Sequence, residues 1–213
     1  MRILSSALIL LAVGCGTSGS LQTSAAQFQL TALPTMVAQK LKLPLYLVAP
    51  PGAVPDRLHV EGTTIFIFHV PSVEIAEVRT FVTRDLKQAF ESYFSTVQVV
   101  DSESKLPATP HVRADIKLAS LAYDRRVSAG EHGQHNEMYG ALEWGFGLRV
   151  SGQPEFIYSF AERTTSGTQM KSFGDTSELE DTFRQALRHL LADFANKDVA
   201  RKLQDTAVAA PAG

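Results

Sequence analysis

The sequence predicts an α+β domain in which a single mainly antiparallel sheet carries two long amphipathic helices on one face. Segments 75–93 and 179–194 place apolar residues at three- and four-residue steps, the spacing of an amphipathic helix. Segments 112–123, 138–150 and 156–160 alternate apolar residues with others, as half-buried antiparallel strands do. The expected order of elements is β-β-α-β-β-β-β-α.

The first half of the domain begins with two expected strands. Residues 40–48 alternate, and Pro44 favours an edge position because proline cannot donate to a neighbouring strand. The apolar run 63–70 is typical of a strand covered on both faces. A helix capped by Ser72 is expected to follow and to run to Tyr93.

The second half is predicted to hold four strands and the last helix. Strand 96–100 precedes the three alternating segments, and a change of phase near Ala119–Ser120 predicts a β-bulge. Phe156, Tyr158 and Phe160 are expected to share one buried face of the last strand. A capping box at 177–180 marks the start of the final helix.

The composition excludes several classes of protein. The chain has 213 residues, 45% of them hydrophobic and 20% charged, and a net charge of −2, which suits one globular domain. A nucleic-acid binder would need a surplus of Lys and Arg. The 12 Phe residues exclude an intrinsically disordered chain, and the single Cys excludes a disulfide scaffold.

The N-terminus has the pattern of an export signal. Arg2 precedes the apolar run 3–13, which is too short to span a bilayer, and the run leads to Gly14 and Cys15. A small residue directly before a cysteine resembles the lipobox of bacterial lipoproteins. The resemblance implies a diacylglyceryl group on the Cys15 thiol, cleavage between Gly14 and Cys15, and an acyl chain such as palmitate on the new amino group. The alternatives are an ordinary signal cut near Gly14 or Ser18, or a buried helix.

The expected organisation follows from this signal. Residues 1–14 form the signal peptide, 15–38 the lipidated cysteine and a flexible tether, 39–203 the α+β periplasmic-type domain, and 204–213 a disordered tail. The second mature residue is Gly16 rather than aspartate. By resemblance to known lipoproteins, this implies an anchor in the outer membrane with the domain facing the periplasm.

No local motif of a common enzyme class occurs, and we expect no cofactor. The segment Glu131–Glu137 contains His132 and His135 and could bind a metal, but its polar, glycine-containing sequence favours an ordinary hairpin tip. For His69 and His189 we expect ordinary local hydrogen bonds.

Two further groups of residues could bind a ligand. Five aromatic residues could line a lipid pocket, although their alternation favours the core: Phe66, Trp144, Phe146, Phe156 and Phe160. Four basic residues could meet anionic lipid or lipopolysaccharide phosphates, although a solvated sheet edge explains them as well: Arg113, Lys117, Arg125 and Arg126.

The layout of residues 60–195 resembles that of small periplasm-facing lipoproteins, including the lipopolysaccharide-assembly lipoprotein. The resemblance lies in the strand at 64–67, the amphipathic helix, the segment 96–101, and the segment 114–118 among three long strands. It implies a non-enzymatic outer-membrane lipoprotein that serves as an accessory or scaffold subunit of a cell-envelope complex. The alternative is a transport or assembly factor that binds lipid or lipopolysaccharide, and a hydrolase is the third hypothesis. The expected partners are the membrane, an envelope protein and a lipid, but no nucleic acid.

Lipidation is predicted to depend on Cys15. We expect Cys15→Ala to abolish labelling with a clickable palmitate analogue and partitioning into detergent, because several acyl chains make a stable anchor. Ser18→Ala is the control and should label like the wild type. Equal partitioning of the Cys15→Ala chain would contradict the lipoprotein interpretation.

Overall fold

The computed structural model describes residues 21–24, 40–60, 64–65, 68–69, 72–130, 133–169 and 177–209. Its main sheet has five strands in the order β10-β9-β8-β2-β7. Strands β8, β9 and β10 pair antiparallel, whereas β2 pairs parallel with both β7 and β8. The bounds are β2 Leu45–Val48, β7 Val97–Val100, β8 Val112–Gly130, β9 Gly133–Val150 and β10 Tyr158–Gln169. The mainly antiparallel α+β class is therefore confirmed.

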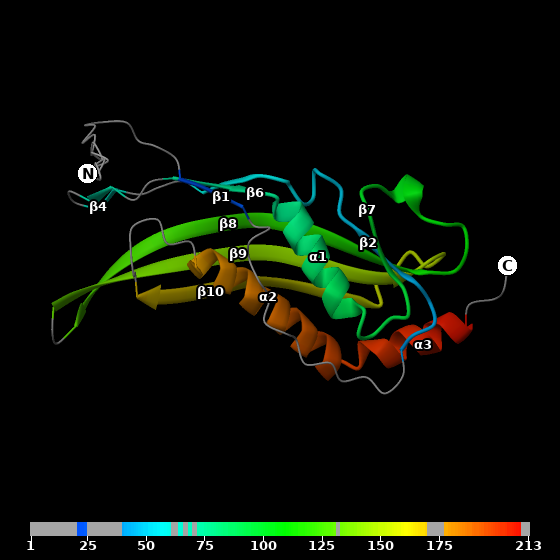
Figure 1. The fold of residues 1–213 in the computed structure, drawn as a ribbon. Helices are drawn as coiled ribbons and strands as arrows, with labels where there is room; N and C mark the ends of the chain where they lie inside the picture. Colours follow the sequence, from blue (N-terminus) through cyan, green and yellow to red (C-terminus); the bar gives the residue numbers. More distant parts are fainter. Residues whose placement is uncertain are drawn as a thin grey trace, which may run out of the picture.

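The longest strands are β8 and β9, which extend well beyond the part of the sheet that the helices cover (Figure 1). Their register shifts between Leu118 and Ser120, so the predicted bulge is confirmed. At a bulge one strand carries one more residue than its partner. A short 3-10 helix, Glu103–Lys105, lies between β7 and β8.

Helices α1 (Val78–Phe90) and α2 (Ser177–Asn196) cross one face of the sheet (Figure 1). The capping box correctly predicts that α2 begins at Ser177. A third helix, α3 (Val199–Ala209), follows after Asp198, whose φ of 51° turns the chain. The tail expected over 204–213 is thus helical as far as Ala209, and Leu203 is fully buried.

Phe90 joins the three layers of the domain. Its ring stacks on Phe146 of β9, with ring centroids 5.3 Å apart, and meets Phe194 of α2 edge-on at 5.4 Å. Tyr93 also packs on Phe194, at 4.8 Å. Offset and edge-to-face aromatic pairs add to the free energy gained by burial alone, so this cluster holds α1 and α2 against the sheet.

A second, small sheet precedes α1 and corrects two expectations. Strand β6 (Val73–Ala76) occupies the segment predicted to be the first helical turn, and Glu77, with a φ of 58°, separates it from α1. Because Ile75 fits both the alternating and the helical pattern, four residues could not decide between them. Strand β6 lies between β1 (Leu21–Ser24) and β3 (Leu58–Val60), so part of the expected tether is a strand.

The strand predicted over 63–70 is instead a hairpin of two short strands, β4 (Thr64–Ile65) and β5 (Phe68–His69). Residues 63, 66, 67 and 70 lie outside the described part of the chain.

Two further expectations about the main sheet were wrong. Strand β2 is an interior strand rather than an edge strand. Pro44 lies directly before it, and the Pro44 carbonyl accepts a hydrogen bond from the Val112 amide at 2.9 Å. Phe156 is 48% exposed rather than buried. It precedes the first residue of β10, Tyr158, so the alternation of that strand does not extend to it.

The aromatic cluster predicts a large effect of one substitution. Phe90→Ala should lower the free energy of unfolding by about 3–5 kcal/mol, as truncations of buried aromatic residues do. Val99→Ala, at a position 43% exposed, is the control and should change it by no more than about 0.5 kcal/mol. Urea denaturation measures both, and similar values for the two variants would contradict the central role of Phe90.

Candidate functional site

A crevice lies between the two long helices and the sheet. Its enclosed space is small, about 30 Å³, and it opens to solvent at its mouth. Side chains of α1, α2, β8 and β9 form these walls, and almost all of the wall is apolar. The lining residues are Phe81, Val82, Asp85, Leu86, Ile116, Lys117, Leu118, Leu142, Trp144, Phe183, Ala186 and Leu187.

The local sequence explains the position of the crevice. Val82 and Leu86 are four residues apart on α1, so they point to the sheet from successive turns. Phe81 meets Phe183 edge-on, with ring centroids 5.2 Å apart, where the two helices approach each other. The floor includes Leu118, where the β8 bulge begins. Bulges change the direction of side chains and often lie beside binding sites.

Asp85 is the unusual residue of the crevice, because only 3% of it is exposed. Its Oδ1 accepts a hydrogen bond from Arg84 Nε at 2.8 Å, but Oδ2 is buried and has no hydrogen-bond partner among the described residues. Burial raises the pKa of the Asp85 carboxyl, and the hydrogen bond and charge of Arg84 oppose that rise only in part.

Trp144 contributes a second unpaired polar atom. The residue is 6% exposed, and its indole Nε1 is buried without a hydrogen-bond partner in the part of the chain that the structure describes. The predicted core position of Trp144 is therefore confirmed. Buried polar groups in native proteins usually have partners, and here a donor and an acceptor without partners line the same apolar crevice.

A positive charge lies beside one wall residue of the crevice, Phe81. The Arg84 guanidinium lies over the Phe81 ring, 5.4 Å from its centroid, and its side chain is 44% exposed. The crevice therefore combines apolar walls, two internal polar atoms and a cation beside Phe81.

An open groove lies on the other face of the sheet. Its floor includes Gly145 and Gly147 of β9, and the Phe156 ring covers Gly147 so closely that a Cβ there would come within 2.7 Å of the ring. Position 147 therefore has no room for a side chain unless the Phe156 ring moves. Arg149 lies over the same ring, 5.3 Å from its centroid.

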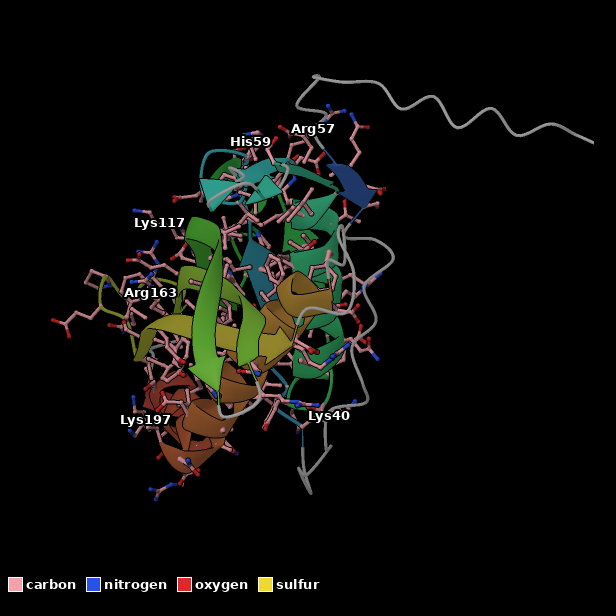
Figure 2. All side chains as sticks on the ribbon, turned by 90° about the vertical axis from the view of Figure 1, so that its left-hand side faces the viewer. Lys40, Arg57, His59, Lys117, Arg163 and Lys197 are labelled. Carbon is pink, nitrogen blue, oxygen red and sulfur yellow. The ribbon has the colours of Figure 1, made fainter. Side chains whose placement is uncertain are left out.

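Carboxylates neutralise the basic residues around this groove. Arg113 donates to Asp115 Oδ1 from Nε at 2.7 Å and also pairs with Glu103. Arg149 Nη2 lies 3.2 Å from Asp115 Oδ2. Figure 2 shows Lys117 and Arg163 on the side of the sheet away from the helices. Arg113 is therefore part of an ion-pair network rather than a free phosphate-binding group.

The other predicted site residues divide into three groups. Gly14, Cys15, Glu131, His132 and Phe66 lie outside the described residues, so the lipidation site and the possible metal site stay predictions. Three residues are placed by backbone only: Arg125, Arg126 and His135 lie in the β8–β9 hairpin, with His135 opposite Ser128.

His189 has the local hydrogen bond expected of it, since its Nδ1 lies 2.6 Å from Glu162 Oε1. Within the described ranges, His, Cys, Asp and Glu form no group of three or more that could hold a metal ion. None of the helices described here is long and apolar enough to cross a membrane.

Comparison with known proteins shows that this chain has a fold similar to that of several solved structures. No family model and no curated protein matches the chain. A solved structure from Helicobacter pylori, described as a homolog of neuraminyllactose-binding hemagglutinin, is 11% identical over 83% of this chain and 96% of that protein, with a TM-score of 0.50. This similarity shows the fold alone.

Two other solved structures align less closely. A Xanthomonas campestris protein of the DUF330 family is 14% identical over 87% of this chain and 98% of that chain, with a TM-score of 0.48. Rare lipoprotein B from Shewanella oneidensis is 13% identical over 73% and 96% of the two chains, with a TM-score of 0.37.

Sequence reasoning missed the crevice and Asp85. A signal was present, because Asp85 lies three residues after Val82 and directly before Leu86, within the apolar stripe of the helix. A carboxylate within such a stripe indicates either a buried partner or a binding site.

The buried carboxyl predicts a pH-dependent effect of Asp85→Asn. The folded-state pKa of Asp85 lies above its ordinary value of 3.8, so the folded chain binds more protons than the unfolded chain between these two values. The free energy of unfolding of the wild type therefore falls as pH rises through this window. We expect the stability of Asp85→Asn relative to wild type to increase as pH rises above about 4.

Urea denaturation across this range measures the effect, and Asp101→Asn is the matched control. The hydrogen bond from Lys105 lowers the pKa of Asp101, so this variant should lose stability relative to wild type as pH rises. Parallel pH curves for wild type and Asp85→Asn would contradict the buried position of the Asp85 carboxyl.

Proposed function

We propose that this chain is a non-enzymatic, lipid-anchored protein of the bacterial outer membrane that binds an acyl chain of a membrane lipid as a transport or assembly factor. The observation that carries the proposal is the apolar crevice between α1, α2 and the sheet. Its walls come from two structural layers, so an alkyl chain that entered by separating the helices from the sheet would be enclosed on both sides. Each methylene group removed from water contributes about 0.8 kcal/mol.

The predicted anchor supports the same function. A lipid attached to Cys15 would hold the domain beside the bilayer, where its ligand is concentrated, and tethering raises the effective concentration of the ligand. The Arg84 guanidinium beside Phe81 could meet an anionic headgroup, since its side chain is 44% exposed.

The groove on the opposite face supports a second candidate, a scaffold subunit that binds an envelope protein. Phe156 is 48% exposed there and has Arg149 over its ring. Exposed aromatic residues beside arginines are typical of the centres of protein interfaces. In this case Phe156→Glu would abolish association with the envelope partner and leave acyl-chain binding unchanged.

Acyl-chain binding is tested by tryptophan fluorescence, because Trp144 is the single Trp of the sequence and lines the crevice. The full chain carrying Cys15→Ala is titrated with myristate, so that no attached lipid competes. We expect the emission of Trp144 to change saturably on binding. Ala186→Leu should weaken binding at least about tenfold, or ~1.4 kcal/mol, because Ala186 is buried in the crevice wall and a larger side chain fills the space.

Ala195→Leu is the matched control, since Ala195 lies on the exposed side of the same helix. Thermal melts confirm that both variants fold, because overpacking a core can cost about 1–3 kcal/mol. Equal myristate affinity in the two variants, or no binding by the wild type, would reject the crevice as a lipid site.

A further inference from the structure

The two edges of the main sheet differ in charge. Strands β10 and β7 are the outermost strands, so each pairs with a described strand on one side only (Figure 1). Strand β10 carries Glu162 and Arg163, and charged side chains protect a sheet edge from pairing with another chain. Strand β7 contains no charged residue, and Val99 on it is 43% exposed. The edge at β7 therefore lacks this protection.

The backbone of β7 has hydrogen-bonding groups that point away from the sheet. The Leu45 amide of β2 donates to the Thr96 carbonyl at 2.9 Å, and Leu45 is paired in register with Val97. Successive residues of a strand direct their N–H and C=O groups to opposite sides. Gln98 therefore faces β2 like Thr96, whereas the groups of Val97 and Val99 point to the free edge. In the described part of the chain, no strand pairs with them.

The sequence of this edge suits pairing with an identical strand. The segment Val97-Gln98-Val99 reads the same in both directions, and a twofold axis brings the same patch of two copies together. With the axis at Gln98, Val97 of each copy lies opposite Val99 of the other, and the two residues exchange N–H···O=C hydrogen bonds. Ser95 then lies opposite Asp101, so no two like charges face each other. The pairing also covers the exposed Val99 side chain.

We infer that β7 pairs antiparallel with β7 of a second copy of this chain, around a twofold axis at Gln98, and joins the two main sheets into one. Opposite residues of an antiparallel pair lie on the same face of a sheet, so α1 and α2 of both copies cover the same side. Strand β7 has four residues, so the interface is small and the dimer dissociates on dilution. This assembly does not depend on lipid binding in the crevice.

Disulfide cross-linking tests the register of the pairing. In the full chain with Cys15→Ala, Gln98→Cys supplies the single thiol, because Cys15 is the only cysteine of the sequence. Opposite residues of a non-hydrogen-bonded antiparallel pair have Cα atoms about 4.5 Å apart, a distance that a disulfide spans. We expect Gln98→Cys to form a disulfide-linked dimer on mild oxidation.

Thr96→Cys is the matched control, since Thr96 and Gln98 are both exposed and lie two residues apart. In the inferred register the two copies of position 96 are separated along the strands by roughly 13 Å, at about 3.3 Å per residue. This variant should therefore stay unlinked. A parallel pair would bring identical residues together at both positions. Equal linking of the two variants would thus overturn the inference.

Analytical ultracentrifugation over a concentration series tests the dimer itself, with the full chain carrying Cys15→Ala. We expect the protein to dimerise as its concentration rises. Val99→Lys adds a charge to the free edge and should raise the dissociation constant of the dimer at least about tenfold. Ser159→Lys is the control, because Ser159 is an exposed residue on β10, at the other edge of the sheet. It should dimerise like the parent chain.

Thermal melts check that each variant is folded. A parent chain that stays monomeric up to its solubility limit would overturn the inference, and so would a folded Val99→Lys chain that dimerises as tightly as the parent. Neither result affects the proposed function, which depends on myristate binding and on Ala186→Leu. Loss of myristate binding with an intact dimer would reject the proposed function alone.

Discussion

The packing of Phe90 between Phe146 and Phe194 is the interaction on which the architecture depends. One ring connects helix α1, strand β9 and helix α2, at distances of 5.3 and 5.4 Å. The domain has no disulfide to hold these layers, since its sequence contains a single Cys. Aromatic burial near the C-terminal ends of α1 and α2 therefore leaves the preceding turns of both helices to form the walls of the crevice.

The polar residues on the two faces of the sheet differ in whether their charges and hydrogen bonds are paired. On the open face, Arg113, Asp115 and Arg149 neutralise one another across neighbouring strands, which suits a solvated surface. On the covered face, Asp85 and Trp144 keep atoms without partners in the described structure. Native interiors retain such groups rarely, and their presence is more informative than the charges outside. On the open face Asp115 Oδ2 also has no hydrogen bond among the described residues, but Arg149 lies 3.2 Å from it.

The sequence predicted the long strands, the bulge and the start of α2, because each depends on a periodic pattern several turns or pairs long. Prediction from sequence failed for short segments. The four residues 73–76 fit both a helical and a strand period, and Pro44 alone does not show which strand lies beside β2. The crevice was not predictable, because its walls come from segments about 100 residues apart, such as Asp85 and Phe183. Only the out-of-place carboxylate of Asp85 gave a local signal.

The pairing of β1 with β6 limits how far the domain can stand from a bilayer. Leu21 is the sixth residue after Cys15, and it already lies in the small sheet. A fully extended chain spans at most about 3.3–3.6 Å per residue, so six residues reach about 20 Å. For a chain anchored at Cys15, the Leu21 end of the small sheet is then held within about 20 Å of the anchored residue. So short an anchor restricts tumbling of the domain and keeps one end of the molecule facing the lipid.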